Sequence, residues 1–303
     1  MFASLAIALA AQQITIPLGK TPRQIERPKA PIEESGPQWA AACKDWDEWD
    51  KPAPPVRIHA NTYLVGTCGI SAILITGTDG HVLIDGGTEA GAELIGANIR
   101  QLGFNLRDIK YLLHSHEHLD HVGGIARLQQ LTGATLVASA PAAKVFETGT
   151  ASPDDPQAGM HKPFPAANVG RVIADGGDVR LGNIRLFAIA TPGHTPGAMS
   201  WRWESCDGGV CRTMVYADSL SAVSRDDYKF SDHPDVVAGF RASFAKLAES
   251  RCEILLTPHP SASQMRDRMT GKQKLFDPEG CKNYAAALVK RLDERLAKEK
   301  GQW

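Results

Sequence analysis

The sequence has almost no net charge and no long apolar run. Its 303 residues hold 33 Lys and Arg against 34 Asp and Glu, a formal net charge of −1 at pH 7. No overall basic field is present to gather nucleic acid or anionic lipid, so we expect no nucleic-acid partner. No stretch of about 18 or more apolar residues occurs, so we expect no membrane span. Nothing in the composition implies an obligate protein partner.

The six cysteines contain no C-x-x-C pair, the spacing typical of a thiolate zinc site. An even count without that spacing favours disulfides in an exported protein; the alternative is six buried free thiols in a cytosolic one. Cys206 and Cys211 flank an Asp-Gly-Gly turn, so a local bridge between them forms easily. The others are Cys43 and Cys68 in the N-terminal third, Cys252 before an expected strand and Cys281 at the start of the last expected helix.

The N-terminus lacks the basic residues that open most secretory signals. Its first residues, MFASLAIALAAQQ, are nonetheless apolar and carry an A-x-A-like site at residues 8–10. We therefore expect residues 1–11 to be a signal peptide that directs the protein to the periplasm, the alternative being a plain apolar tail. Residues 12–55 are rich in Pro and charge and predict an extended arm, and residues 56–303 predict a single domain.

Beyond residue 55, short β-branched runs alternate with amphipathic stretches. Such a mixture predicts an α+β protein in which helices cover the faces of sheets. Thr88 is expected to cap the first of these helices, and Gly103 to end it. Strands are expected at residues 61–66, 71–77, 81–87, 109–115, 134–140, 178–191, 198–205, 211–218 and 253–260, and helices at 88–104, 123–133, 144–149, 236–252 and 281–301.

The segment HSHEHLDHVGG, residues 114–124, holds four histidines. It fails the zinc-protease motif H-E-x-x-H, because Asp120 stands where the second histidine would be. His116 and His118 follow an expected strand and, two residues apart, can point the same way. Asp120 and His121 lie further round the curve and face a neighbouring point. This spacing favours two adjacent metals over one, and imidazole with carboxylate suits zinc.

Two further histidines stand between prolines at expected strand exits, His194 in TPGHTPG and His259 in LLTPHPS. Prolines limit the freedom of the backbone and can hold a ligand rigidly. Alone, either histidine would be an ordinary loop residue. With H-x-H-x-D-H upstream, both become candidate metal ligands.

The run H-E-H-L-D-H at residues 116–121, the two downstream histidines, and LIDGG at residues 83–87 resemble the metallo-β-lactamase superfamily. The resemblance covers nearly all of the chain beyond residue 55, and it implies an αβ/βα sandwich of two packed β-sheets with helices on the outer faces. Within the superfamily, YADSLSA at residues 216–222 resembles subclass B3, which has serines here and no cysteine ligand. The three expected cysteine pairs and the exported N-terminus also resemble B3 enzymes.

The resemblance implies a hydrolase that opens the cyclic amide of penicillins, cephalosporins or carbapenems and so confers antibiotic resistance. A hydroxide held between two zinc ions would attack the amide, and Asp120 would orient it as well as bind metal. No acyl-enzyme is needed, and the serine signature G-x-S-x-G is absent. By the same resemblance, one zinc would take His116, His118 and His194, and the other Asp120, His121 and His259.

Asp218 leaves the branch of the superfamily open. In glyoxalase-II-like thioesterases and lactonases an acid at the corresponding place bridges both metals. Asp218 is either such a ligand or a buried acid that hydrogen-bonds the loop backbone, and the B3 resemblance favours the second role. A metal-binding protein without catalysis is a third hypothesis, disfavoured because structural zinc sites are normally closed by four ligands. His114 is either a support for the ligands or a satisfied buried histidine.

Substrate contacts are expected in the loops around the ligands. Ser219 and Ser221 are candidates to donate hydrogen bonds to a substrate carboxylate, and Tyr228 to assist the oxyanion. Trp39 and Gln157 are candidates to line the mouth of the site. For each, the alternative is backbone satisfaction or plain surface packing.

Overall fold

The computed structural model describes residues 32–44 and 48–301 of the chain. The predicted signal peptide, residues 1–11, lies outside the described residues, as does the predicted arm up to residue 31. Among the described helices, none combines the length and the apolar character that crossing a bilayer requires.

Seven strands form the first sheet and five form the second. The first contains β1 (Val56–His59), β2 (Thr62–Leu64), β3 (Ile73–Thr76), β4 (His81–Ile84), β5 (Ile109–Leu113), β6 (Thr135–Ala138) and β7 (Val169–Val172), in that order. Its strands pair antiparallel from β1 to β4 and parallel from β4 to β7. The second contains β8 (Asp178–Leu181), β9 (Ile184–Ala190), β10 (Met199–Asp207), β11 (Val210–Tyr216) and β12 (Ile254–Leu256). Its order is β12-β11-β10-β9-β8, and only β11 and β12 pair in parallel.

Alternation along the strands builds three apolar layers, because successive strand residues point to opposite faces. In β3, Ile73 and Ile75 belong to the core between the sheets, whereas Leu74 packs beneath helices on the outer face. In β11, Met214 joins the same central core and Val215 packs beneath helices on the other side. The sandwich is thus specified by strands that are apolar on both faces.

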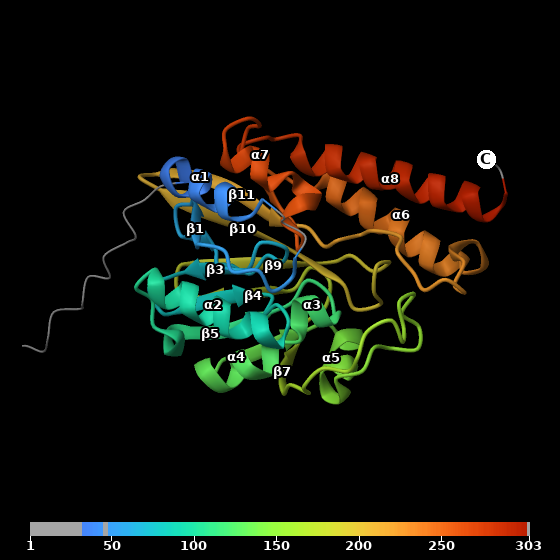
Figure 1. Cartoon of the computed structure of the whole chain (residues 1–303), viewed down its shortest axis with the longest axis horizontal. Coiled ribbons are helices and arrows are strands. Elements are labelled where there is room, and N and C mark those ends of the chain that lie inside the picture. The colour runs from blue at the N-terminus through green and yellow to red at the C-terminus, as the bar shows by residue number, and fades with distance from the viewer. Residues whose placement is uncertain (1–31, 45–47, 302–303) are drawn as a thin grey trace, which may run out of the picture.

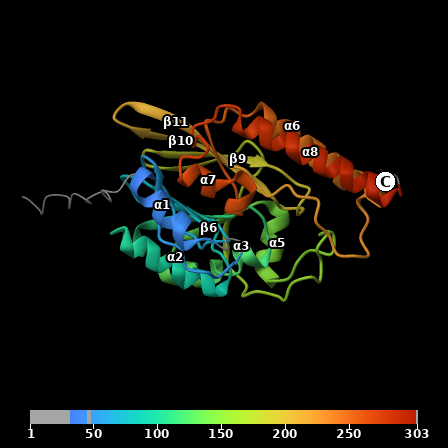
Figure 2. The ribbon, with the colours of Figure 1, turned by 45° about the horizontal axis from the view of Figure 1, so that its top comes forward.

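The outer layers are helical. Helices α2 (Glu89–Gln101), α4 (Ile125–Thr132) and α5 (Ala140–Thr148) pack on the first sheet, and α6 (Pro234–Glu249) and α8 (Gly280–Glu299) pack on the second. Figure 1 shows these layers from top to bottom, and α6 and α8 stay side by side in the turned view of Figure 2. The predicted αβ/βα sandwich is therefore confirmed. The remaining elements are α1 (Ile32–Ala42), α3 (Leu119–Val122), α7 (Met265–Met269), η1 (Leu106–Asp108), η2 (Phe230–Asp232) and η3 (Pro260–Ser263).

Helix α2 begins and ends as its sequence predicts. The Thr88 hydroxyl accepts the backbone N–H of Gly91 at 3.1 Å, which caps the first turn. At the other end, Gly103 has a φ of +82°, a conformation that glycine adopts without strain. The chain then turns toward β5, which leads to the histidine-rich segment.

The predicted arm is not extended throughout. Residues 32–42 form helix α1, which contacts α7 and β1. Trp39 is fully buried in the core between the sheets, and Cys43, just after the helix, is bonded to Cys68. Tertiary packing of the indole outweighs the weak helical signal of a Pro- and charge-rich stretch. The boundaries at residues 11 and 55 stay predictions.

All six cysteines are paired, so the prediction of disulfides is confirmed. The pairs are Cys43–Cys68, Cys206–Cys211 and Cys252–Cys281, and the described part of the chain contains no free cysteine. Three disulfides suggest a protein that is exported to an oxidising compartment.

Candidate metal centre

Two of the six predicted ligands, His194 and His259, converge because they follow strands that run in the same direction. In the second sheet β9 and β12 are parallel to each other, so their carboxyl ends meet at one edge. Gly193, just before the β9-exit histidine, has a φ of +145°, and a Cβ on it would lie 2.5 Å from the Phe240 ring. Only glycine fits this turn. His116 and His118 follow β5, Asp120 and His121 stand in α3, His194 follows β9, and His259 follows β12.

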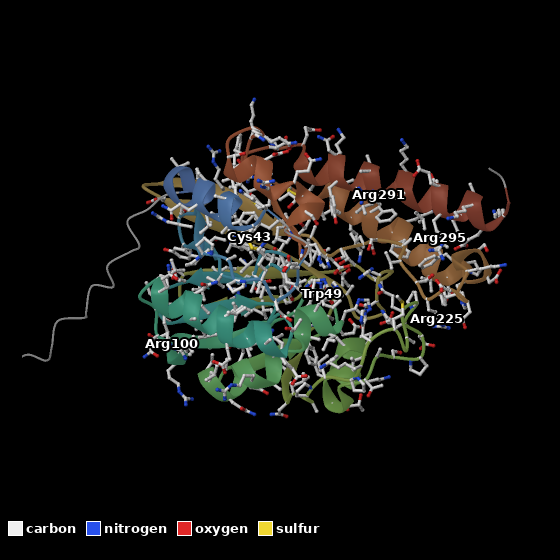
Figure 3. All side chains as sticks on the ribbon, viewed as in Figure 1. Cys43, Trp49, Arg100, Arg225, Arg291 and Arg295 are labelled. Atoms are coloured by element: carbon white, nitrogen blue, oxygen red, sulfur yellow. A yellow bond between two sulfur atoms is a disulfide. The ribbon has the colours of Figure 1, made fainter. Side chains whose placement is uncertain are left out.

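These side chains surround a cavity of about 150 Å³. Five of the six ligands line it directly, and His121 lies fully buried beside it. The other lining residues, which we call the cavity wall, are Trp49, Gln157, His161, Ser219, Ser221 and Val223. Figure 3 labels Trp49 near the middle of the view, between the two helical layers.

The first ligand set consists of His116, His118 and His194. One nitrogen from each can be chosen so that all three lie within 4.8 Å of one another. The rings stand nearly perpendicular, with centroids 4.6 Å apart for His116 and His194 and 4.9 Å apart for His116 and His118. Three imidazoles turned toward one point are a typical zinc arrangement.

Each ring of this set is held from behind through its other nitrogen. His116 Nδ1 lies 2.8 Å from Asp218 Oδ1, and His118 Nε2 lies 2.9 Å from Asp155 Oδ2. His194 Nδ1 donates to the carbonyl oxygen of Ser221 at 2.8 Å. Because carbonyls and carboxylates accept hydrogen bonds, these contacts leave the opposite ring nitrogen with a free lone pair.

The second set, Asp120, His121 and His259, is tighter. Asp120 Oδ2 lies 3.1 Å from His121 Nε2 and 3.4 Å from His259 Nε2, and the two imidazole nitrogens are 3.2 Å apart. Four ligands arranged tetrahedrally at about 2.0–2.1 Å from a zinc ion stand roughly 3.3 Å from one another. The triangle therefore has the size that a zinc ion requires.

The two sets are adjacent. His116, Asp120 and His121 also have ligand atoms within 4.8 Å of one another, so His116 borders both sets. His116 Nε2 is buried and has no hydrogen-bond partner among the described residues. A buried nitrogen without a partner is costly, and a metal ion would satisfy it. The donor set thus fits a metal cofactor.

The charges around the site favour a cation. Burial lowers the pKa of His194 to about 3 and that of His116 well below its ordinary value, so both rings are neutral and able to bind metal. Burial opposes a charge on His121, but the Asp120 and Asp85 carboxylates together outweigh it and raise the pKa of His121 to about 10. A divalent cation satisfies the same demand for positive charge while displacing protons.

The comparisons with known proteins agree with this geometry. The sequence model of the metallo-β-lactamase superfamily matches residues 65–259, which include all six candidate ligands. The chain belongs to this superfamily. Among curated proteins it is 28% identical over 148 residues to a hydroxyacylglutathione hydrolase of Bradyrhizobium sp. (strain ORS 278), a match that covers 48% of each chain. The chain thus spans about half the length of the curated relatives it matches.

Solved structures resemble the chain over much more of its length. The MIM-2 metallo-β-lactamase is 57% identical, with a TM-score of 0.84 over 88% of this chain and 98% of that one. MIM-1 from Novosphingobium pentaromativorans is 48% identical, with a TM-score of 0.85 over the same shares. MEM-A1, a subclass B3 enzyme from a soil metagenome library, is 42% identical, with a TM-score of 0.79 over 84% of this chain and all of that one. Subclass B3 is the group that this chain resembles most.

Asp218 stands behind a ligand in this metallo-β-lactamase fold. Its Oδ1 contacts the His116 ring, and its Oδ2 accepts the backbone N–H of Leu220 at 3.1 Å. Burial raises the pKa of the Asp218 carboxyl, and the backbone N–H groups of Leu220 and Ser219 oppose that rise. These contacts match the buried-acid role and not that of a bridging ligand.

Two acids that the sequence analysis did not single out fasten the ligand loops. Asp85, in the LIDGG signature, has a φ of +64° and accepts from Ser115 N–H at 2.6 Å, Ser115 Oγ–H at 2.8 Å and the Tyr216 hydroxyl at 2.7 Å. Its position in the LIDGG signature could have indicated this supporting role from the sequence. Asp155 supports His118 from the long loop after α5, and it is fully buried although the residues around it are mostly polar or proline.

Glu117 lies between two ligands and turns away from the metal cavity. Its side chain is nevertheless buried, and it accepts the Thr195 hydroxyl and the Gly197 N–H, each at 2.7 Å. It thereby ties the TPGHTPG loop to the H-x-H segment. Burial raises the pKa of Glu117, an effect that these hydrogen bonds oppose.

The structure separates the five predicted substrate contacts. Ser219, Ser221 and Gln157 line the cavity. Trp39 does not, because it is buried in the core between the sheets, and Trp49 takes the place expected for it. Tyr228 is also buried and lies outside the lining, stacked on His233 with ring centroids 4.2 Å apart.

His114 is buried, as the second alternative expected, but it is only partly satisfied, because its Nδ1 has no hydrogen-bond partner among the described residues. Its Nε2 accepts the Ser139 N–H at 3.2 Å, and its carbonyl accepts the Trp201 indole N–H at 2.8 Å. Burial lowers the pKa of His114 to about 4, so the ring is neutral. It joins β5 to the neighbouring strands and does not contribute a ligand atom to either set.

Proposed function

We propose that the protein is a dizinc β-lactamase of the B3 type, which hydrolyses the cyclic amide of penicillins, cephalosporins or carbapenems and so confers antibiotic resistance. The observation that carries the proposal is the pair of adjacent three-ligand sets around one open cavity, the first with ligand atoms within 4.8 Å of one another and the second within 3.4 Å. It is supported by the similarity to B3 enzymes over more than four-fifths of the chain.

We assign one zinc ion to His116, His118 and His194, and a second to Asp120, His121 and His259. Three ligands for each ion leave a position open for water or substrate, as catalytic rather than structural zinc sites do. Zinc bound here would supply Lewis-acid polarisation of the amide carbonyl and a water acidic enough to act as nucleophile at neutral pH.

The side chains around that chemistry have separate tasks. Asp120 is the catalytic residue, because its carboxylate reaches into the cavity and can accept a proton of the attacking water and orient it. Ser219 Oγ is buried without a hydrogen-bond partner among the described residues, so it is free to donate to a substrate carboxylate. Ser221 Oγ lies 3.3 Å from His194 Nδ1 and can also turn toward the cavity.

An acyl-enzyme is not part of the proposal. The spacing S-x-x-K of serine β-lactamases does occur, at Ser243 and Lys246 in α6. However, the Ser243 hydroxyl donates to the Pro192 carbonyl at 2.8 Å, and the Lys246 ammonium binds Asp175 at 2.8 Å. Neither side chain lines the metal cavity.

The second candidate is a thioesterase or lactonase in which Asp218 bridges the metals. The hydroxyacylglutathione hydrolase relative is the observation in its favour. The contact between Asp218 and His116 Nδ1 weighs against it. The metal-binding lone pair of His116 is on Nε2, at the opposite side of the ring, so Asp218 lies behind the ligand and not between the metals.

We further propose that the enzyme acts in the periplasm after removal of the predicted signal peptide at residues 1–11. The three disulfides support this location, because such bonds persist in oxidising compartments.

The deciding experiment is turnover of a chromogenic cephalosporin by the purified protein, together with its zinc content by elemental analysis. We expect two zinc ions per chain, hydrolysis that a chelator abolishes, and activity that added zinc restores. A glutathione thioester and a lactone serve as comparison substrates. A fully metallated protein that cleaves the thioester or lactone but no β-lactam would overturn the proposal in favour of the second candidate.

A further inference from the structure

A second cavity, of about 290 Å³, opens on the far side of the loop that carries Ser219. It lies among β12, η3, α7 and α8, and it shares no lining residue with the metal cavity. Its lining includes Leu255, Gln264, Arg268, Lys274, Asn283 and Arg291. We call it the rear cavity.

The rear cavity is rich in positive charge. Arg268, Lys274 and Arg291 line it, against one acid, Asp277. No described carboxylate lies within ion-pair distance of any of the three cations. Arg291 projects from α8 and is labelled in Figure 3.

Arg268 is the unusual member of this group, because only 8% of it is exposed. Its guanidinium donates to the carbonyl of Leu255 at 2.5 Å and to that of Leu275 at 2.8 Å, and Asp277, which lines the same cavity, offsets only part of its charge from beyond ion-pair distance. A buried charge is costly unless it is paired. Burial accordingly lowers the pKa of Arg268 to about 10. An anion in the cavity would supply the missing charge.

One side chain connects the rear cavity to the metal cavity. Tyr284 lines the rear cavity, and its hydroxyl donates to the backbone carbonyl of Ser219 at 3.0 Å. Ser219 lines the metal cavity, and its neighbour Leu220 has a φ of +51°, a strained conformation for this residue. A displacement of Tyr284 would therefore move a strained loop that borders the substrate.

We propose that the rear cavity binds a small oxyanion, the carboxylate, phosphate or sulfate group of a small molecule, and that the bound anion shifts Ser219 through Tyr284. Guanidinium and ammonium groups with amide side chains are the donors that such anions require. The binding half of this proposal is independent of the reaction, whereas the effect on substrate affinity rests on the proposed β-lactamase function.

Binding is tested on the zinc-loaded full chain by titrating sulfate and, separately, succinate at constant ionic strength, with backbone amide resonances as the readout. We expect saturable shifts at Asn283, Tyr284 and Ser219. Sulfate and succinate distinguish an inorganic ion from an organic carboxylate. Absence of saturable shifts with both anions would overturn the proposal.

Paired variants localise the binding. Lys274→Gln combined with Arg291→Gln removes two cations of the rear cavity. We expect each of the two substitutions to raise the dissociation constant of the anion about tenfold or more. The matched control is Lys282→Gln with Lys290→Gln, two exposed cations whose side chains do not line the cavity. Shifts that persist in the first pair, or that are lost in the control, contradict the assignment.

The connection to the metal cavity is tested by kinetics with and without the anion that binds. We expect a change of about fivefold or more in KM with little change in kcat, and we expect Tyr284→Phe to abolish it while anion binding remains. An unchanged KM with saturated anion overturns the role of Tyr284. A protein that binds the anion but hydrolyses no β-lactam contradicts the proposed function and leaves the rear-cavity site standing.

Discussion

The ligand histidines and the cavity wall share one cavity, but they are held in different ways. The rings of His116, His118 and His194 are each fixed from behind by a carboxylate or a carbonyl. The wall has few such partners: the Ser219 hydroxyl has none among the described residues, and Val223 is 46% exposed. The side chains of the ligand half are thus held by more hydrogen bonds than the Ser219 and Val223 side chains of the wall.

The difference follows from what each half must do. A metal site loses affinity when its ligands are displaced, and outer partners that fix the ligands are worth 10–100-fold in affinity or activity. A wall that contacts substrates of varied shape gains from side chains that can rotate. We therefore expect substitutions in the ligand half to abolish turnover and substitutions in the wall to change KM.

The largest effect is expected for Asp120→Asn. The amide cannot serve as an anionic ligand or accept the proton of the attacking water, so kcat should fall by more than about 100-fold, beyond what loss of a supporting residue costs. Steady-state kinetics and zinc content measure both consequences. Near-normal kcat with two zinc ions bound would remove Asp120 from the mechanism.

Asp218→Asn tests whether a support behaves like a ligand. As the residue behind His116, it should reduce activity or zinc affinity by about 10–100-fold while two zinc ions still bind at saturation. Asp155→Asn, behind His118, is the matched variant and should behave alike. Loss of one metal from Asp218→Asn alone would instead identify a bridging ligand.

The two tryptophans sharpen the contrast between core and wall. Trp39→Ala should lower the free energy of unfolding by about 3–5 kcal/mol, since it opens a hole in the core between the sheets. Trp49→Ala should leave stability nearly unchanged and raise KM by roughly tenfold, a loss of about 1.4 kcal/mol of contact with the substrate. Thermal unfolding and kinetics of both variants provide the test, and equal stability losses would refute it.

The smallest effect is expected far from both halves of the site. Glu299 accepts the N–H groups of Phe230 and Ser231, and the Arg295 guanidinium, at 3.2, 2.8 and 2.5 Å. Although burial opposes it, these contacts keep the pKa of Glu299 below its ordinary value. The carboxylate therefore stabilises the fold above the unfolded-state pKa, and this stability is lost as the pH falls through the lower folded-state pKa.

Glu299→Gln should accordingly lose about 1 kcal/mol at pH 7, with no change in kcat or KM. The difference from the unsubstituted protein should shrink below about pH 4.5. Denaturant unfolding at a series of pH values measures it. A difference that is constant with pH would show that the charge of Glu299 contributes nothing.

The ligand set could be predicted from the sequence because metal chemistry imposes local spacing. His116, His118 and Asp120 lie in one short segment, and His194 and His259 stand in Pro-flanked turns whose role depends on that segment. Most strands could be predicted as well, because they are short and apolar; β1 and β7 were missed, and β7 is largely exposed and so lacks that pattern. In these regions local pattern and tertiary structure agree.

The cavity wall was harder to predict from the sequence than the ligand set. Its residues come from segments without periodicity, and their positions depend on how those segments pack against the rest of the domain. Two tryptophans ten residues apart, Trp39 and Trp49, have opposite roles that only packing distinguishes. Asp155 is buried by its contact with a distant histidine, which the surrounding polar loop does not indicate. The ring of Tyr228 stacks on the His233 ring and does not line the cavity.

The Cys43–Cys68 disulfide encloses Trp49 in a covalent loop whose two ends are 25 positions apart in the sequence. The metal ligands all lie outside this loop. An enzyme made in a reducing cytosol would therefore keep its metal chemistry while the tether on one side of the substrate site is released. Oxidation of this pair would then restrain the segment that carries Trp49 beside the cavity, a restraint that the positions of the metal ligands do not depend on.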